Sequence, residues 1–426
     1  MDLDSTPWWT KAIIYELYVD KFAGNFSGLT AKLDYFNSLG VNTLWLLPHY
    51  PTPGIDGGYD ISDYTAIRPD LGTMADFSEF IKASHAKNLR VIIDLVLNHT
   101  SSEHPWFAES RSSKDNPKRH WYLWSDNQDG FSQAFIHFEH LKAKNWIKNE
   151  VTGDYYYATF YPQQPDLNWD NPEVFTAMME VVDFWLDKGV DGFRLDAVAR
   201  LIKREGTNCF ALPESHQILK RIRQHIDSKY PGIVLMAESG GWIHEAKPFF
   251  GDGDECQLVI HFPLAVELLS TIYTRDLSRV HDLWNQSQGI PENSRWAVFL
   301  TSHDSVDLFF LSNDWQKQQL IQAVDPAGFF TYPPGQSIGA RLTQVGQGKL
   351  DNILWAFKEQ LSLPGVPIIY YGNEIGMPNL SFIEKPGDIR DFVRGQFNWS
   401  EVDRQRSDPN SLLNQVSKLI HQKSNS

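Results

Sequence analysis

Short apolar runs recur along the 426-residue chain, separated by stretches with the three-to-four-residue spacing of amphipathic helices. Several runs, such as the one at 90–99, are apolar at consecutive positions, so both faces of the strand would be buried. Parallel strands covered by helices have this pattern. The runs that we interpret as strands are 12–22, 41–48, 90–99, 189–197, 232–238, 256–262, 295–304 and 366–374.

The alternation of these runs with helical patterns predicts an α/β fold, a closed (β/α)8 TIM barrel rather than an open sheet. Helices are expected at 172–188 and 214–230, for example, and a last one at 411–421 would be the eighth barrel helix. Little chain remains after it, so we expect no further C-terminal domain.

The regular spacing breaks once, between the third and fourth runs. Residues 101–170 are rich in Trp, Tyr, Asp, Asn and Gly and carry few helical signals. Because a loop of that length in a compact fold usually has a function, we predict an excursion domain over the barrel mouth. The predicted organisation is a first barrel part at 1–100, the excursion domain at 101–170 and the rest of the barrel at 171–426.

Charge and composition limit the binding partners and the cellular compartment that we expect. A formal net charge of −15 argues against a nucleic-acid or anionic-membrane partner. No apolar stretch is long enough to span a bilayer, and the first nine residues lack the pattern of a signal peptide. Cys209 and Cys256 lie far apart, as free thiols in a reducing compartment would, so we expect a cytoplasmic protein.

Polar and charged residues follow the predicted strands at their carboxyl ends, where barrels build active sites. One acid there would only suggest a helix cap, but several on successive strands indicate a site. They are His99, Arg194, Asp196, Glu238, His303 and Asp304.

Paired carboxylates of this kind fit the cleavage of a glycosidic bond with retention, which uses a nucleophile and an acid/base roughly 5–5.5 Å apart. Arg194, on the same strand face as Asp196, should lower the pKa of that carboxyl and keep it ionised as nucleophile. Glu238 follows an apolar run, where burial should raise its pKa and suit it to be the acid.

The remaining polar and aromatic residues would contact the sugar. We expect Asp304 to hold sugar hydroxyls, and His99 and His303 to donate hydrogen bonds next to the developing positive charge. Tyr59, just after the second strand, would form the floor of the pocket. A core packing role is the alternative for each histidine and for Tyr59.

Five segments together resemble the signature regions of the alpha-amylase superfamily: 91–99, 192–198, 237–238, 302–304 and 164–169. The resemblance implies a retaining double displacement with Asp196 as nucleophile, Glu238 as acid/base and Asp304 as transition-state stabiliser. It also places Gln164, in the last segment, among the substrate-binding residues.

Within the superfamily the chain is most similar to trehalose synthases, through segments such as 57–64 and 204–209, and less closely to amylosucrases, through 22–29 and 302–304. In these disaccharide-acting relatives an Asp and an Arg close the far end of the pocket, and the matching positions here are Asp56 and Arg394. Such a pair would admit one glucosyl unit, and a surface ion pair is the alternative interpretation.

The chain departs from the superfamily pattern at several positions. Where trehalose synthases have Cys-Glu-Asn, this chain has Cys-Phe-Ala at 209–211, which affects the contacts of the acceptor sugar. Asn98 and Asp166 match calcium ligands of many relatives, but Lys203 stands where a third, acidic ligand is expected. Because an ammonium group opposes a divalent cation, we expect no tight calcium site and no required cofactor. We also expect the superfamily's C-terminal β-sandwich to be absent from this sequence, either naturally or by truncation.

The sequence therefore predicts a retaining enzyme that acts on a small α-glucoside of the maltose, trehalose or sucrose type by transglucosylation. A hydrolase of short malto-oligosaccharides is the main alternative. A non-catalytic sugar-binding barrel is less expected, because such relatives carry a membrane span and have lost catalytic acids.

Overall fold

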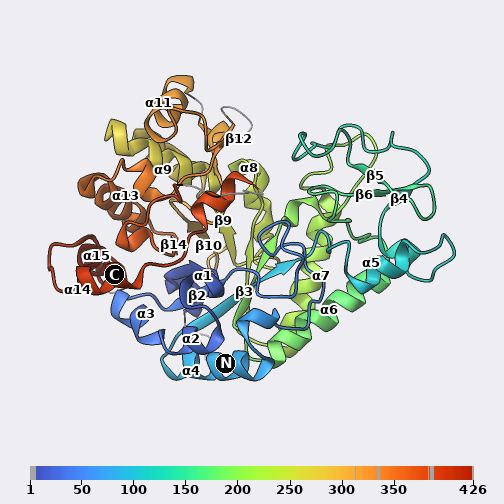
Figure 1. The fold of residues 1–426 in the computed structure, drawn as a ribbon, viewed down its shortest axis with the longest axis horizontal. Coiled ribbons are helices and arrows are strands. Elements are labelled where there is room, and N and C mark those ends of the chain that lie inside the picture. Colours follow the sequence, from blue (N-terminus) through green and yellow to red (C-terminus); the bar gives the residue numbers. More distant parts are fainter. Residues whose placement is uncertain (1–5, 312, 333–335, 382, 384–387, 425–426) are drawn as a thin grey trace.

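The computed structural model describes residues 6–311, 313–332, 336–381, 383 and 388–424. Its centre is a closed barrel of eight parallel strands in the order β1-β14-β10-β9-β8-β7-β3-β2 (Figure 1). Each strand lies inside a predicted run, so the predicted fold class is confirmed. The barrel strands are β1 (Ile14–Leu17), β2 (Thr43–Leu46), β3 (Arg90–Val96), β7 (Gly192–Asp196), β8 (Val234–Ala237), β9 (Leu258–Ile260), β10 (Arg295–Val298) and β14 (Val366–Tyr370).

Helices cover the outside of the barrel (Figure 1). The three helices expected from the sequence form, and capping residues explain where two of the barrel helices begin. The Asn171 side chain caps the first turn of α6 with Pro172 following it, and Thr73 and Asp76 form a capping box at α4. The main helices are α3 (Leu33–Leu39), α4 (Met74–Ala86), α6 (Pro172–Asp187), α7 (Pro213–Lys229), α9 (Phe262–Thr274), α10 (Ser278–Gln286), α13 (Leu350–Ser362), α14 (Trp399–Arg406) and α15 (Leu412–Ser424).

Between β3 and α6 the chain leaves the barrel and forms a small lobe of its own. The lobe contains α5 (Pro105–Ser110) and an antiparallel sheet of β4 (Trp124–Ser125), β6 (Tyr155–Tyr157) and β5 (Trp146–Lys148). An isolated bridge between His99 and Asp166 joins the chain just after β3 to the segment that leads from the lobe back to the barrel.

A second excursion, which the sequence did not predict, follows β10. It contains β11 (Val306–Asp307), α11 (Asp314–Val324), β12 (Thr331–Tyr332) and β13 (Ser337–Ile338), and β13 pairs with both other strands. Figure 1 shows the two excursions on opposite sides of the view. Both start at the carboxyl ends of barrel strands, the end that carries the predicted site.

The core is continuous from barrel to helices, and the buried residues include ionisable ones inside the barrel. Glu16, Asp94, Arg194 and Glu374 are each at most 1% exposed. Buried charges are stable only when paired, so these residues indicate a built polar site. No helix in the described part of the chain is long and apolar enough to cross a membrane.

Candidate active site

Arg194 lies on β7 at the centre of a carboxylate cluster. Its Nη1 donates to Asp196 Oδ1 at 2.5 Å and to Asp94 Oδ1 at 2.7 Å. Its Nη2 lies 2.9 Å from Glu238 Oε1. One buried guanidinium therefore binds three carboxylates from the neighbouring strands β3, β7 and β8.

The pKa of Asp196 is raised well above its ordinary value. Burial is the largest cause, and the negative charges of Glu238 and Asp94 add to it, while Arg194 opposes them. Arg194 lowers the pKa of Asp196, but burial and the charges of Glu238 and Asp94 outweigh it, so the net shift is upward and not the downward one that we expected. Asp196 therefore keeps a proton to higher pH than an exposed carboxyl would.

Glu238 follows β8 directly, and both of its oxygens have partners. Oε1 faces Arg194, and Oε2 accepts a hydrogen bond from the Ala197 N–H at 2.8 Å. Ala197 has a φ of 48°, a left-handed conformation that is uncommon for a residue with a Cβ. This conformation turns the chain sharply from β7 into η4 (Val198–Arg200) and places the N–H against Glu238.

Asp304 is surrounded by cations. Its Oδ1 lies 3.3 Å from Arg390 Nη1 and 3.3 Å from Arg394 Nη2, and its Oδ2 lies 3.3 Å from His303 Nε2. Although burial raises the pKa of Asp304, the charges of these three residues hold it well below its ordinary value. Asp304 is therefore a permanently ionised carboxylate at neutral pH.

The two histidines differ in how they are held. Both ring nitrogens of His303 have protein partners: Nδ1 lies 2.6 Å from Glu16 Oε1, and Nε2 lies 2.7 Å from Tyr59 Oη. We expected His303 to donate to sugar hydroxyls, but here it orients Tyr59, whose ring stacks on it at 5.4 Å. The buried Nε2 of His99 has no partner among the described residues, and burial lowers the pKa of His99 to about 4. A neutral His99 thus keeps one nitrogen for a ligand.

Asp56 pairs with a different arginine from the one predicted. Its Oδ1 accepts from Arg390 Nη2 at 2.7 Å, and its Oδ2 accepts from Gln164 Nε2 at 2.9 Å. Arg394 instead donates from Nε to the His303 carbonyl at 3.0 Å, besides its contact with Asp304. Arg394 is still close to Asp56, since a Cβ on Gly57 would lie 2.1 Å from Arg394 Nη1.

Sequence reasoning missed four charged residues of this site: Glu16, Asp94, Asp307 and Arg390. Asp94 and Glu16 lie within barrel strands rather than after them, so they were counted with the apolar runs. Arg390 lies on η8 (Ile389–Val393), four residues before Arg394, and this spacing was the available signal. Burial and the charges of Asp304 and Glu238 raise the pKa of Asp307 to about 7.

Lys203 occupies the position between the two residues that match calcium ligands. Its Nζ forms a buried ion pair with Asp166 and donates to Asn98 Oδ1 at 2.8 Å and to the Arg200 carbonyl at 2.6 Å. The ammonium thus contacts the same oxygens that a cation would. In the part of the chain that the structure describes, no three His, Cys, Asp or Glu side chains are grouped as metal ligands.

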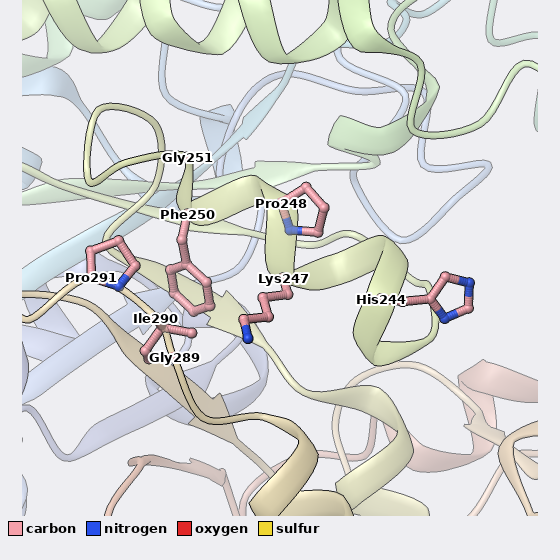
Figure 2. A pocket seen from close by; sticks show the side chains of 8 residues that line it. All are labelled: His244, Lys247, Pro248, Phe250, Gly251, Gly289, Ile290 and Pro291. Carbon is pink, nitrogen blue, oxygen red and sulfur yellow. The ribbon is translucent and has the colours of Figure 1, made fainter.

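A separate hollow of about 270 Å³ lies beside η5 (Lys247–Phe250) (Figure 2). Phe250, Ile290 and Pro291 give it a mainly apolar wall, and Lys247 Nζ donates to the Gln288 carbonyl. None of the carboxylates described above lines it, so we place the chemistry at the strand ends.

Comparison with known proteins gives concordant matches. A family model described as the alpha-amylase catalytic domain matches residues 5–418. The trehalose synthase/amylase of Mycolicibacterium smegmatis is 40% identical over 407 residues, which is 93% of this chain and 67% of that protein. The trehalose synthase of Thermus thermophilus is 41% identical over 404 residues, which is 92% of this chain but 41% of that protein.

A solved structure agrees in fold. An isomaltulose synthase variant from Erwinia rhapontici NX5, in complex with its natural substrate sucrose, is 26% identical. The match has a TM-score of 0.78 and covers 100% of this chain and 85% of that chain. With an eight-stranded barrel, a family match over almost its whole length and carboxylates at the end of β7 and after β8 and β10, the chain belongs to the alpha-amylase family.

Proposed function

We propose that the protein is a retaining α-glucoside-processing enzyme that transfers a glucosyl unit between small molecules. The observation that carries the proposal is the link from Arg194 to both Asp196 and Glu238, with Asp304 held nearby by Arg390 and Arg394. It supplies two carboxylates that one arginine holds together and a third that stays ionised.

In the first step Asp196 attacks the anomeric carbon of the donor, and the bond from that carbon to the glycosidic oxygen breaks. Glu238, acting as the general acid, gives its proton to the departing oxygen. In the second step an acceptor hydroxyl attacks the glucosyl ester and releases Asp196, while its proton passes to Glu238. Asp304 and His99 would hold the sugar hydroxyls.

The substrate that we propose is a disaccharide of the maltose, trehalose or sucrose type. Asp56, Gln164, Arg390 and Arg394 make a hydrogen-bonded wall next to Asp304, and a wall of that kind suits a terminal glucose. The names of the relatives, trehalose synthases and an isomaltulose synthase solved with sucrose, support the same substrate class.

We further propose that no metal is required, because Lys203 already neutralises Asp166. A cytoplasmic location is supported by the two cysteines, Cys209 and Cys256, which are both free and buried.

Incubation with maltose, sucrose and trehalose, followed by chromatography of the products, tests the proposal. We expect an isomeric disaccharide besides glucose from at least one donor, with the α configuration retained. Glucose as the only glucosyl product would favour the alternative, a hydrolase, which the name synthase/amylase of one relative also allows. If all three donors stay intact, the proposed function is wrong.

A further inference from the structure

Arg200 is a cation without a partner at the mouth of the barrel. It ends η4, four residues after Asp196, and is half-buried. Its guanidinium carbon lies 5.0 Å from the centre of the Phe210 ring. Among the described residues, none forms a hydrogen bond or an ion pair with this guanidinium, so all five of its N–H groups remain to be used.

The position of Arg200 is beside the acid/base. The N–H of Ala197, at the start of the same turn, donates to Glu238, and the charge of Glu238 acts on Arg200. The Ala211 N–H donates to the Ala199 carbonyl at 2.7 Å, which fixes the loop that carries Phe210 against η4. Because Glu238 protonates the departing oxygen and deprotonates the acceptor, groups beside it contact the leaving or accepting molecule.

Cations gather around η4, although the whole chain has a net charge of −15. Lys142 and Lys203 lie near Arg200. Burial and the positive charges of Arg200 and Lys203 lower the pKa of Lys142 to about 7, although the negative charge of Asp166 opposes them. The two carboxylates that act on Arg200 are already bound to other cations, Asp166 to Lys203 and Glu238 to Arg194.

The donors of the two lysines are used by the protein itself. Lys142 Nζ donates to the Thr159 carbonyl at 2.7 Å, and Lys203 is held by Asn98 and Asp166. Of these three cations, Arg200 is therefore the one that is available to a ligand. An arginine fork stacked on an aromatic ring is well suited to a phosphate or a carboxylate.

We propose that Arg200 binds an anionic group, a phosphate or a carboxylate, on the molecule that accepts the glucosyl unit. The proposal rests on the proposed function, since it names the acceptor class of the same site. An acceptor hydroxyl forms the new bond to the anomeric carbon, the ester bond to Asp196 breaks, and the proton passes to Glu238. The anionic group does not react and only orients the acceptor. Phe210 packs against the apolar face of the acceptor.

Calorimetric titration of the full chain with glucose 6-phosphate and with glucose tests this directly. We expect glucose 6-phosphate to bind at least about tenfold more tightly, with an affinity that falls as sodium chloride is added. Arg200→Gln should abolish the preference, and Arg200→Lys should keep part of it. Equal affinities in the wild type, or a preference that survives Arg200→Gln, would overturn the proposal.

Arg204→Gln is the matched control, because it removes the same charge from the same segment. Arg204 donates to the Asp170 carboxylate at 2.7 and 2.8 Å, so its guanidinium already has a partner. We expect this variant to keep the preference. Competition by inorganic phosphate or by glucuronate then identifies the oxyanion, and either one supports the proposal.

Transfer from maltose separates this proposal from the proposed function. The ratio of kcat/KM for glucose 6-phosphate to that for glucose as acceptor should fall about tenfold in Arg200→Gln and stay constant in Arg204→Gln. If maltose is consumed without any preference for the phosphorylated acceptor, the inference about Arg200 is wrong and the proposed function stands. If the anion binds through Arg200 but no donor is cleaved, the anion site stands and the proposed function is wrong.

Discussion

Arg194 binds three carboxylates at once, and two of them, Glu238 and Asp94, add to the burial that raises the pKa of Asp196. From the sequence, Arg194 and Asp196 are expected to form an ion pair with no further partners, because they are two residues apart on one strand. The other two partners come from β3 and from the end of β8, which only the closed barrel brings together. The direction of the Asp196 pKa was therefore beyond local sequence reasoning, although the residues themselves were identified.

The proposed roles of Asp196 and Glu238 predict different kinetic defects. Both Asp196→Asn and Glu238→Gln should lower turnover of maltose by several powers of ten. With α-glucosyl fluoride, whose leaving group needs no acid, Glu238→Gln should still form the glucosyl-enzyme in a burst, whereas Asp196→Asn should not. Rapid-quench measurement of released fluoride shows the difference.

Circular dichroism should give the same folded spectrum for both variants as for the wild type. If either variant keeps more than about a tenth of the wild-type turnover of maltose, the assigned roles are wrong.

The buried carboxyl of Asp307 predicts how the stability of the fold depends on pH. Its carboxyl has a pKa raised to about 7 by burial and by Asp304 and Glu238. The folded state thus binds this proton more tightly than the unfolded state, so ionisation of Asp307 destabilises the fold progressively as pH rises from about 4 to about 7. Asp307→Asn removes the penalty and should gain at least about 1 kcal/mol of unfolding free energy relative to the wild type at pH 8.

Denaturant unfolding at pH 5 and pH 8 measures this gain, which should be smaller at pH 5. Asp403→Asn, at a carboxylate that is 76% exposed, serves as the control and should show no such difference between the two pH values. A gain that is equal at both pH values would exclude the titration of Asp307 as its cause.

At the scale of elements, the barrel was predictable because each parallel strand is covered on both faces and so appears as a short apolar run. The first excursion was predictable because its seventy or so residues break the spacing of the runs. The second, from β11 to β13, was missed because its strands have two residues each and α11 resembles a barrel helix in length and position. The predicted boundaries of the domains stay predictions.

The junction between β3 and the first excursion depends on Lys203, which predicts a response to metal removal. Wild-type melting temperature should not change with EDTA, because the ammonium already compensates Asp166. Lys203→Met leaves that carboxylate buried and unpaired, which should cost about 3–5 kcal/mol of unfolding free energy. Lys203→Glu should instead make stability depend on Ca²⁺, since three oxygen ligands would then converge.

Differential scanning calorimetry with EDTA and with Ca²⁺ checks both variants. Lys148→Met, at a lysine that is 52% exposed in the same excursion, is the control and should change little. A large loss of wild-type stability in EDTA, restored by Ca²⁺ alone, would show that a metal site exists and that Lys203 does not replace it.

At the scale of the whole molecule, the loops after β2 and β14 meet because both strands neighbour β1 in the closed barrel. This topology made a pair between Asp56 and an arginine predictable. It did not decide which arginine, because Arg390 and Arg394 are only four residues apart in the loop after β14. Packing selected Arg390 for Asp56 and placed Arg394 on Asp304 and on the backbone of His303.

The resulting wall predicts which substrates the molecule accepts. Asp56, Arg390 and Arg394 are each 13% exposed or less at the side chain, so they form a buried network and not a surface ion pair. We expect this network, next to Asp304, to leave no room for a second sugar on the non-reducing side, so disaccharides should be processed and interior bonds of starch should not. Arg390→Gln should lower kcat/KM for maltose about 10- to 100-fold, since a charge-assisted contact to the terminal glucose is lost. Arg404→Gln, at an arginine that is 70% exposed, should leave it unchanged. Viscometry of soluble starch provides the opposing test, because a rapid loss of viscosity requires cleavage within the polymer and is incompatible with a pocket closed by these three residues.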